Sequence, residues 1–317
     1  MTDYRSAAAD YLATRRAMGY KLFYQGQMLA QFAAYLDAAG AERLTIDHGL
    51  AWAKQPAHGA AAWWAVRLST VRAFARYLSA LDPATEIPPR GLIREPSHRI
   101  VPHIYSPDDI HRVLQAAGRL PIAHRADTYQ TLIGLIAVTG MRNGEAVRLD
   151  RDDVDLEEGL LTIRNSKYGR SRQIPIHPST VEALAAYARR RDRRRYRPDG
   201  RRHHHPPSSA SFFTSTTGTR LLRDNVSTVF PRLVRDAGLV VSGRDRPPRL
   251  HDLRHSFAVT TLIRWYQQGL DVEQRLPLLA TYLGHIAPKS TYWYLSAVPE
   301  LLELIADRLD AIAEVGP

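Results

Sequence analysis

A proline-rich run in the first third of this chain constrains its fold more than any other feature. Proline inside a helix removes a backbone hydrogen bond and clashes with the preceding turn, so no continuous helix crosses DPATEIPPRGLIREPSHRIVPHIYS. The run is also polar and poor in candidate core residues. Its prolines are Pro83, Pro88, Pro89, Pro96 and Pro102. We therefore interpret residues 83–104 as an interdomain linker between a first domain, residues 1–82, and a second, residues 105–317.

The first domain has the apolar spacing of helices throughout residues 3–81. Two stripes recur at helical spacing, and they predict a helical core. These stripes are Met28, Leu29, Phe32 and Leu36, then Leu68, Val71, Ala75 and Leu78. Arg67, Arg72 and Arg76 lie largely off the second stripe. They form either an ordinary solvated face or a set of phosphate contacts, and the sequence leaves both interpretations open.

The second domain mixes helices with a little strand. Ser106 can cap a helix that starts at SPDDI, and Pro107 suits the first helical position. LLTIRN and RQIPI are short β-type runs on either side of SKYGRS, which suggests a hairpin tip. From Asn225 onward helical patterns dominate, ending with the amphipathic ELLELIADRLDAIA. The predicted fold is therefore mainly α with a small β-hairpin or sheet, an α+β class.

Charge and composition narrow the partners. The 317 residues carry a formal net charge of +11, which favours a polyanion, although an anionic membrane surface or plain solubility remain alternatives. The absence of cysteine excludes disulfides, thiolate zinc sites and thiol nucleophiles. No uncharged apolar run approaches the roughly 20 residues that span a bilayer, and the N-terminus lacks the apolar core of a signal peptide. We expect a soluble, cytoplasmic protein without membrane association.

Candidate functional residues begin at the segment TGMRNGE. Arg142 follows a glycine that ends a predicted buried helix, and Glu145 can hold its guanidinium if the segment is helical. Lys167 lies at the predicted hairpin tip, where a flexible amine can reach a leaving group. A surface ion pair and a solvated lysine are the simpler interpretations of these residues when each is taken alone.

Two later segments add histidines, an arginine and a tyrosine. HDLRHSF places His251 and Arg254 on one face of a helix, an arrangement suited to binding phosphate and moving a proton. His251 and His255 also have metal-ligand spacing, but no third ligand is evident, so we expect no metal. His285 follows the apolar helix LPLLATYLG, and Tyr294 lies nine residues later.

These residues make chemical sense as a group. Guanidiniums neutralise phosphate oxygens, lysine and histidine transfer protons, and a tyrosine phenolate can attack phosphorus. Because a free tyrosine has a pKa of about 10, it needs neighbouring cations or a base to act as a nucleophile. Tyr292 and Trp293 nearby are most simply core aromatics.

The order and spacing of this group resemble the tyrosine recombinase, or phage integrase, family, over about residues 105–300. The family pattern is Arg–Lys–His-x-x-Arg–His/Trp–Tyr, and every position has a counterpart here. The counterparts are Arg142 with its acidic partner Glu145, Lys167, His251, Arg254, His285 after Gly284, and Tyr294. Tyr292 has the wrong spacing. The first 80 residues resemble the family's SAM-like core-binding domain more weakly, and the Arg/His/Pro-rich stretch 189–210 looks like an extended loop.

The resemblance implies a chemical role for each residue. Tyr294 would attack a scissile phosphate and form a 3′-phosphotyrosine, while Arg142 and Arg254 would stabilise the transition state. Lys167 would protonate the leaving 5′-oxygen. His251 would assist as an acid or base, and His285 would hydrogen-bond the phosphate. The phosphotyrosine conserves the bond energy, so the resemblance implies no metal and no cofactor.

The resemblance also implies a two-domain, C-shaped clamp on double-stranded DNA at specific sites. A homotetramer would act through a Holliday junction, associated with the nucleoid, most simply for a mobile element. Arg170 and Arg172 in the hairpin join the three helical arginines as candidate DNA contacts. The final helix would pack either onto a neighbouring protomer or in cis.

Three other functions are alternatives to a recombinase. A type IB topoisomerase uses similar residues, but the helical first domain favours a recombinase. A catalytically inactive DNA-binding or architectural protein would not need Lys167 and Tyr294 together. A metal-dependent nuclease would need clustered carboxylates, which the sequence does not suggest.

Overall fold

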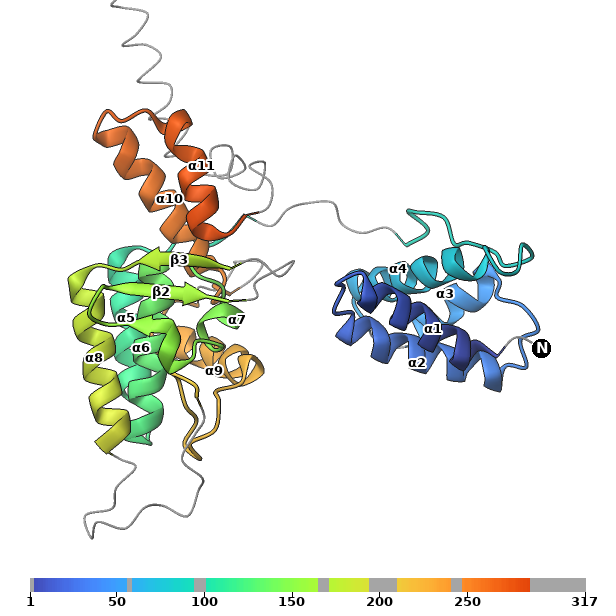
Figure 1. Ribbon diagram of the computed structural model, residues 1–317, viewed down its shortest axis with the longest axis horizontal. Helices are drawn as coiled ribbons and strands as arrows, with labels where there is room; N and C mark the ends of the chain where they lie inside the picture. Colours follow the sequence, from blue (N-terminus) through green and yellow to red (C-terminus); the bar gives the residue numbers. More distant parts are fainter. Residues whose placement is uncertain are drawn as a thin grey trace, which may run out of the picture. The chain divides into compact units, whose positions relative to one another are not determined.

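The computed structural model describes residues 3–55, 59–93, 101–164, 171–193, 210–240 and 247–285. The chain divides into two compact units, Met1–Ile100 and Val101–Pro317. Both are mainly helical, and the second also contains a small sheet (Figure 1). The predicted mainly α class with a small β element is therefore confirmed.

The described residues of the first unit form four helices. They are α1 (Tyr4–Ala17), α2 (Phe23–Ala38), α3 (Ile46–Lys54) and α4 (Ala61–Leu78). Asp3 caps α1 by accepting the backbone N–H groups of Arg5 and Ser6. All eight residues of the two predicted apolar stripes are buried in its core, so that part of the sequence interpretation is confirmed.

Much of the run expected to be a linker packs on the units beside it. The backbone N–H of Glu86 donates to the carbonyl of Leu44 at 3.0 Å, and Arg72 Nε donates to the carbonyl of Pro88 at 2.7 Å. On the other side, the backbone N–H of Tyr105 donates to Ser256 Oγ at 2.8 Å. Residues 94–100, between these anchors, lie outside the described residues.

The second unit combines helices with a three-stranded antiparallel sheet of order β1–β2–β3. Its strands are β1 (Val154–Asp155), β2 (Leu160–Ile163) and β3 (Arg172–Pro175). The pairing of Leu161 with Ile174 confirms the two predicted strands. Its helices are α5 (Pro107–Gly118), α6 (Ala123–Thr139), α7 (Asn143–Ala146), α8 (Pro178–Arg193), α9 (Arg223–Asp236), α10 (Asp252–Gln267) and α11 (Val272–Leu283).

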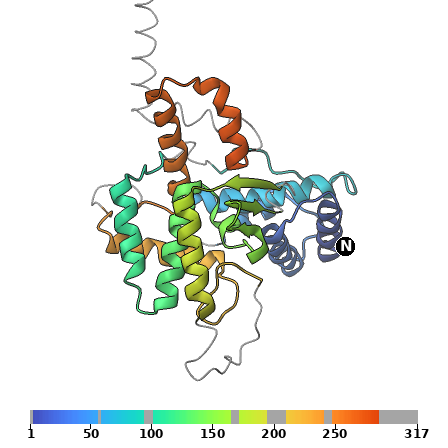
Figure 2. The same cartoon turned by 60° about the vertical axis from the view of Figure 1, so that its left-hand side comes forward.

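Helices α10 and α11 form a small core of their own at one end of this unit. Two views place most of the pair beyond β3 (Figures 1 and 2), while the start of α10 contacts the end of α6 through Arg254 and Gly140. Seven of their apolar residues form a cluster separate from the main core. They are Ala258, Val259, Leu262, Val272, Leu276, Leu279 and Leu283. The C-terminal end of α11 lies near β3, where Arg172 Nε donates to the Tyr282 carbonyl at 2.8 Å.

Gly140 ends α6 and sets the direction of the next segment. It has φ 60°, a left-handed conformation that glycine adopts without a Cβ penalty. A Cβ at this position would lie 2.6 Å from Cδ1 of Phe257 and 2.9 Å from Cδ2 of Leu283. The missing side chain therefore lets α10 and α11 approach the turn that leads to Arg142.

Replacing Gly140 by Ala is expected to destabilise the protein more than the same change at Gly238. Both glycines have positive φ, so each substitution costs about 1–2 kcal/mol of backbone strain. A Cβ at Gly238 would meet nothing within 4 Å, whereas at Gly140 overpacking adds about 1–3 kcal/mol. Thermal unfolding followed by circular dichroism compares the two variants. Equal melting temperatures would contradict the close approach at Gly140.

Candidate active site

Arg142 lies at the start of the short helix α7, where Glu145 fixes its position. Glu145 Oε2 accepts the backbone N–H of Arg142 at 3.1 Å, and Oε1 accepts its Nη1 at 2.8 Å. The Glu145 side chain is only 2% exposed, while that of Arg142 is 31% exposed. The expected ion pair is thus present, with the carboxylate inside the protein and the guanidinium accessible from solvent.

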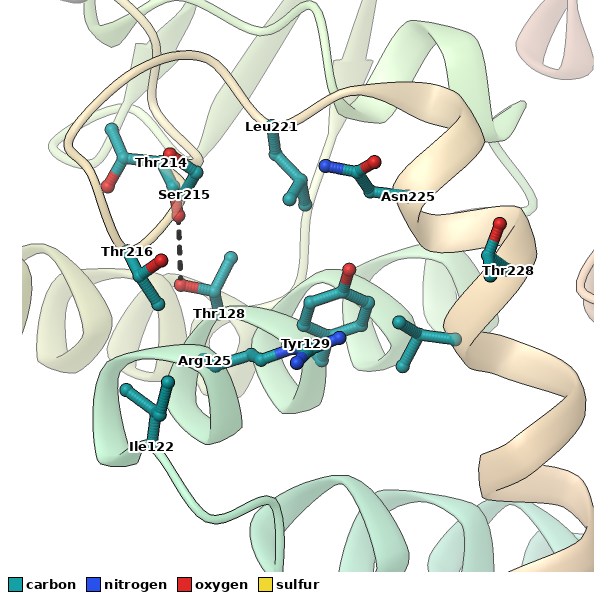
Figure 3. A pocket seen from close by; sticks show the side chains of 11 residues that line it. Ile122, Arg125, Thr128, Tyr129, Thr214, Ser215, Thr216, Leu221, Asn225 and Thr228 are labelled. Atoms are coloured by element: carbon teal, nitrogen blue, oxygen red, sulfur yellow. Dashed lines mark hydrogen bonds between the residues drawn. The ribbon is translucent and has the colours of Figure 1, made fainter.

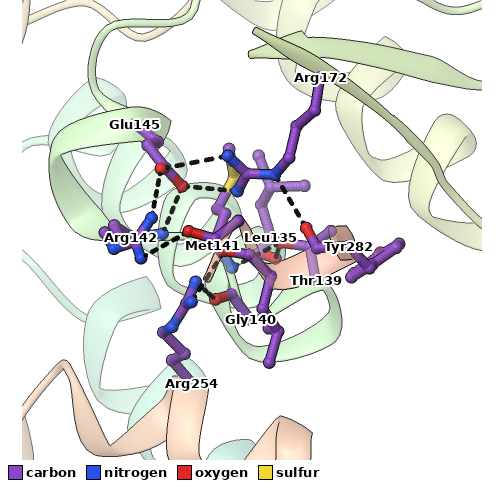
Figure 4. Close-up of polar contacts among 11 residues, drawn as sticks. Leu135, Thr139, Gly140, Met141, Arg142, Glu145, Arg172, Arg254 and Tyr282 are labelled. Carbon is purple, nitrogen blue, oxygen red and sulfur yellow. Dashed lines mark hydrogen bonds and ion pairs between the residues drawn. The ribbon is translucent and has the colours of Figure 1, made fainter. Parts of the chain in front are cut away.

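The same carboxylate binds a second arginine, Arg172 on β3. Arg172 Nη2 donates to Glu145 Oε2 at 2.9 Å and Nη1 donates to Oε1 at 3.3 Å. Burial alone would raise the pKa of Glu145, but the hydrogen bond and charge of Arg172, followed by those of Arg142, lower it to about 2. Glu145 therefore stays ionised at neutral pH and bridges two guanidiniums (Figure 4).

Arg254, on α10, is held by backbone carbonyls. Its side chain is almost completely buried, with the residue 2% exposed. Nη1 donates to the carbonyl of Gly140 and Nη2 to that of Leu283, each at 2.8 Å. Arg254 thus joins the end of α6 to the end of α11, and these contacts orient its guanidinium without neutralising it.

Three successive carbonyls at the C-terminal end of α11 each accept a hydrogen bond from a different arginine. The last carbonyls of a helix have no partner within it, so they need donors from elsewhere. The pairs are Arg172 Nε with Tyr282 O at 2.8 Å, Arg254 Nη2 with Leu283 O at 2.8 Å, and Arg142 Nη2 with Gly284 O at 3.0 Å. The partial negative charge of a helix C-terminus favours such cations. Figure 4 shows these side chains converging from different elements.

Three histidines lie around the arginines. His251 is exposed at the start of α10, and its ring meets that of His255 edge to face, with centroids 4.8 Å apart. His285 follows Gly284, and its backbone N–H donates to the carbonyl of Ala280 at 2.8 Å. The expected approach of the HDLRHSF and LGH segments is therefore present, and it also includes His255, which the sequence marked only as a possible metal ligand.

All three histidines are held neutral. Burial, followed by the charges of Arg254 and Arg142, lowers the pKa of His285 to about 3. Burial and then His251 lower the pKa of His255 to about 4. Desolvation and the Arg254 charge also lower the pKa of His251. A neutral imidazole can donate one hydrogen bond and accept another, so at neutral pH each ring keeps both capacities.

The remaining expected site residues divide into two groups. Lys167, Arg170, Tyr292 and Tyr294 lie outside the described residues. Of the helical arginines, Arg76 is exposed on α4 and stays a candidate for DNA contact. The structure therefore brings together Arg142, Glu145, His251, Arg254 and His285 from the expected set.

Three of the arginines considered as phosphate contacts, Arg67, Arg72 and Arg172, have partners within the protein. Arg67 is 6% exposed; its guanidinium lies 3.6 Å from the Trp52 ring centroid, and Nη2 donates to the Trp52 carbonyl at 2.8 Å. Arg72 also donates to the carbonyls of Pro88 and Pro89. Arg172 is 11% exposed and joins the network around Glu145. Its position was readable from strand alternation, because it shares a face with the buried Ile174.

A separate pocket of about 250 Å³ lies between α6 and α9 (Figure 3). Its walls include Arg125, Thr128, Tyr129 and Asn225, and Thr128 Oγ1 donates to the carbonyl of Thr214 at 3.3 Å. None of the expected catalytic residues lines it. The arginine and histidine cluster is therefore the candidate active site.

The described residues include no group of three or more histidines and carboxylates placed to hold a metal ion. The same part of the chain has no helix long and apolar enough to cross a membrane.

Proteins with similar sequences match this chain over most of its length. Residues 105–300 match the model of the phage integrase family. The putative integrase/recombinase y4rB of Sinorhizobium fredii is 41% identical over 315 residues, which cover 98% of each chain. The tyrosine recombinase XerC of Azotobacter vinelandii is 30% identical over 227 residues, 72% of this chain and 67% of its own.

Solved structures show the same fold at lower identity. The Tn1549 transposon integrase in complex with transposon right end DNA has a TM-score of 0.62 at 15% identity, covering 97% of this chain and 99% of that one. A lambda integrase tetramer bound to a Holliday junction has a TM-score of 0.59 at 19% identity, covering 92% of this chain and 76% of that one. With the family match and the close relatives, these findings show that the chain belongs to the phage integrase family of tyrosine recombinases.

Proposed function

We propose that this chain is a site-specific DNA recombinase that cuts and rejoins duplex DNA through a covalent bond to Tyr294. The observation that carries the proposal is the pair of guanidiniums, Arg142 and Arg254, fixed on one scaffold beside His285. Such a group suits a phosphate that becomes more negative in the transition state, where each preorganised donor contributes about 3–4 kcal/mol. Membership of the family supports breaking and rejoining of DNA strands as the reaction.

The cleavage reaction needs neither a metal ion nor a nucleotide cofactor. The Tyr294 phenolate oxygen attacks the phosphorus of the scissile phosphodiester, and a 3′-phosphotyrosine bond forms as the bond to the 5′-oxygen breaks. Lys167 donates the proton that the leaving 5′-oxygen needs. Attack by a 5′-hydroxyl on the phosphotyrosine reverses these changes and releases Tyr294. The bond energy is retained throughout, so rejoining needs no external source.

The two catalytic histidines act from a neutral state. His251 serves as the acid or base that assists transfer of the Tyr294 proton, and His285 donates a hydrogen bond to a phosphate oxygen. The lowered pKa values of both imidazoles support this, because a neutral ring can accept a proton that a charged ring cannot. Glu145 stays behind Arg142 as its anchor.

We place this chemistry in the movement of a mobile element. The described relatives are integrases and recombinases, and one structural neighbour is a transposon integrase on transposon DNA. The two units would close around the duplex as a C-shaped clamp, with Arg76 and Arg170 among its phosphate contacts. Four protomers would exchange strands through a Holliday junction, with the C-terminal helix packing in trans, in the nucleoid of the cytoplasm. The net charge of +11 supports a polyanionic partner.

Replacing Tyr294 by Phe is expected to abolish covalent attachment to DNA without weakening binding. The phenol oxygen is the only group removed, so phosphate contacts remain. Nicked suicide duplexes tiled across the chromosomal DNA that flanks the gene serve as substrates, and the adduct is read on denaturing gels. Tyr292→Phe is the matched control and should still form the adduct. Trapping of Tyr294→Phe, with loss of trapping by Tyr292→Phe, would move the nucleophile to Tyr292.

Binding to any duplex should weaken steeply with salt, because each neutralised phosphate releases counterions. Arg76→Gln is expected to reduce the slope of log K against log salt by about 1. Arg67→Met should leave the slope unchanged, because Arg67 is buried against Trp52. Fluorescence anisotropy over a salt series measures both slopes. A nearly flat slope for the unmodified chain would contradict the clamp.

DNA binding is expected to take up protons in acidic solution. Arg254 and Arg142 contribute to the low pKa of His285, and a bound phosphate offsets their charge, so the pKa rises in the complex above its free value of about 3. Affinity should therefore increase as pH falls through the pKa of His285 in the complex toward about 3. Calorimetric titration in buffers of different ionisation enthalpy counts the protons, and His285→Gln should reduce the count. Proton release on binding would overturn this electrostatic account.

A further inference from the structure

We propose that Arg172 is a positioning residue for DNA cleavage, which fastens the β2–β3 hairpin and Glu145 to the last turn of α11. The inference rests on the proposed function, since it concerns the same reaction. Arg172 then has a role different from the phosphate contact that the sequence suggested. It aligns Arg142 and His285, although it lies outside the expected catalytic set.

The contacts of Arg172 all point inward. Nε donates to the Tyr282 carbonyl at 2.8 Å, and the two Nη atoms donate to the two carboxylate oxygens of Glu145. Only 11% of the side chain is exposed. One guanidinium therefore links three elements: β3, which carries it, α7, which carries Glu145, and the end of α11. Its planar fork suits this bidentate arrangement, and a lysine ammonium does not reproduce it.

Glu145 makes the position of Arg142 depend on Arg172. Oε1 accepts from both guanidiniums, while Oε2 accepts from Arg172 Nη2 and from the backbone N–H of Arg142, so the orientation of the carboxylate is fixed from both sides. Removal of Arg172 leaves the carboxylate buried with one cationic partner and free to rotate toward it. Arg142 then loses the rigid support that holds its Nη2 against the Gly284 carbonyl.

A space at Gly284 accommodates the Arg172 guanidinium. A Cβ on Gly284 would lie 2.7 Å from Arg172 Nη1 and 2.8 Å from Cζ, closer than real Cβ contacts permit. Gly284 also has φ 69° at the C-cap of α11, and His285 follows it. The guanidinium thus packs directly against the turn that presents His285. This contact does not involve Glu145, and it supports the same positioning role for Arg172.

Chain connectivity explains what this fastening achieves. Lys167 lies in the hairpin segment that leads into β3, and Tyr294 lies in the segment that follows α11. Since α10 and α11 have a separate apolar core, the polar contacts at the end of α11 carry much of its attachment to β3. Arg172 therefore ties the element from which the general acid extends to the element from which the nucleophile extends.

The test compares Arg172→Lys and Arg172→Met with the unmodified chain. On the nicked suicide duplex that the unmodified chain cleaves, single-turnover adduct formation at saturating DNA should fall by about 10²-fold for Arg172→Met. Arg172→Lys should fall less, since it keeps the charge. The DNA dissociation constant and its salt slope should stay unchanged for both. The matched control is Arg164→Met, on the same hairpin but 61% exposed, and it should keep the cleavage rate.

A pH profile separates positioning from a general loss of structure. The charges that face Glu145 are Arg172 from β3 and Arg142 from α7, and Arg172 is the stronger cause of its low pKa. Without Arg172 that pKa rises, so the acid limb of the cleavage rate should move to higher pH in Arg172→Met. The charge of Arg172 also contributes to the low pKa of His285, so its removal raises that pKa as well and moves the acid limb in the same direction. Arg172→Lys provides the same comparison if the methionine variant does not fold.

Three outcomes would overturn the inference. A salt slope reduced by about 1 with an unchanged rate at saturating DNA would make Arg172 a phosphate contact. An unshifted acid limb in a slowed variant would leave only a structural role. A third such outcome comes from the double variant that combines Arg172→Met with Glu145→Gln. If its loss of cleavage rate equals the product of the two single losses, the two residues do not act together. Failure of the unmodified chain to form an adduct would instead count against the proposed function.

Discussion

The second unit depends on one electrostatic arrangement, the binding of three guanidiniums to the last carbonyls of α11. Burying a cation is costly unless hydrogen bonds and opposite charge replace its water. Here the negative end of a helix dipole supplies part of the compensation, and Glu145 supplies the rest for Arg142 and Arg172. Because the donors come from β3, α7 and α10, the end of α11 is fixed only when all of these elements are in place.

This arrangement also sets the protonation of its neighbours. Positive charge from Arg142 and Arg254 helps to keep His285 neutral, and burial keeps His255 neutral beside His251. The same charge attracts a phosphate, so one set of residues prepares both the binding of an anion and the proton capacity of the imidazoles. Low local polarity strengthens each of these effects. The packing of α10 against α11 therefore influences the protonation of these histidines, which contribute little to the apolar core between the two helices.

The sequence was informative where function demands an unusual local pattern. The spacing of Arg142 to Glu145, the glycine before His285 and the two short β-type runs each predicted what the structure contains. Buried arginines were not predictable from composition. Arg67 was assigned to a solvated or DNA-facing surface because arginine is usually exposed, yet Trp52, distant in sequence, offers it a ring face and a carbonyl. Strand alternation places Arg172 on the face of the buried Ile174, but the partners of Arg172 come from segments far along the chain, so its contacts were not predictable.

Backbone carbonyls, rather than one carboxylate for each arginine, hold the guanidiniums of this site. This leaves their positive charge available for a DNA phosphate. A carboxylate bound to each arginine would orient the guanidiniums equally well, but it would cancel the charge that a phosphate needs. Backbone carbonyls orient through hydrogen bonds and carry only partial charge, so Arg254 between Gly140 and Leu283 keeps its full positive charge toward an anion. Glu145 is shared between Arg142 and Arg172, so one negative charge positions two guanidiniums. The end of α11 thus combines rigid positioning with retained charge at Arg142 and Arg254.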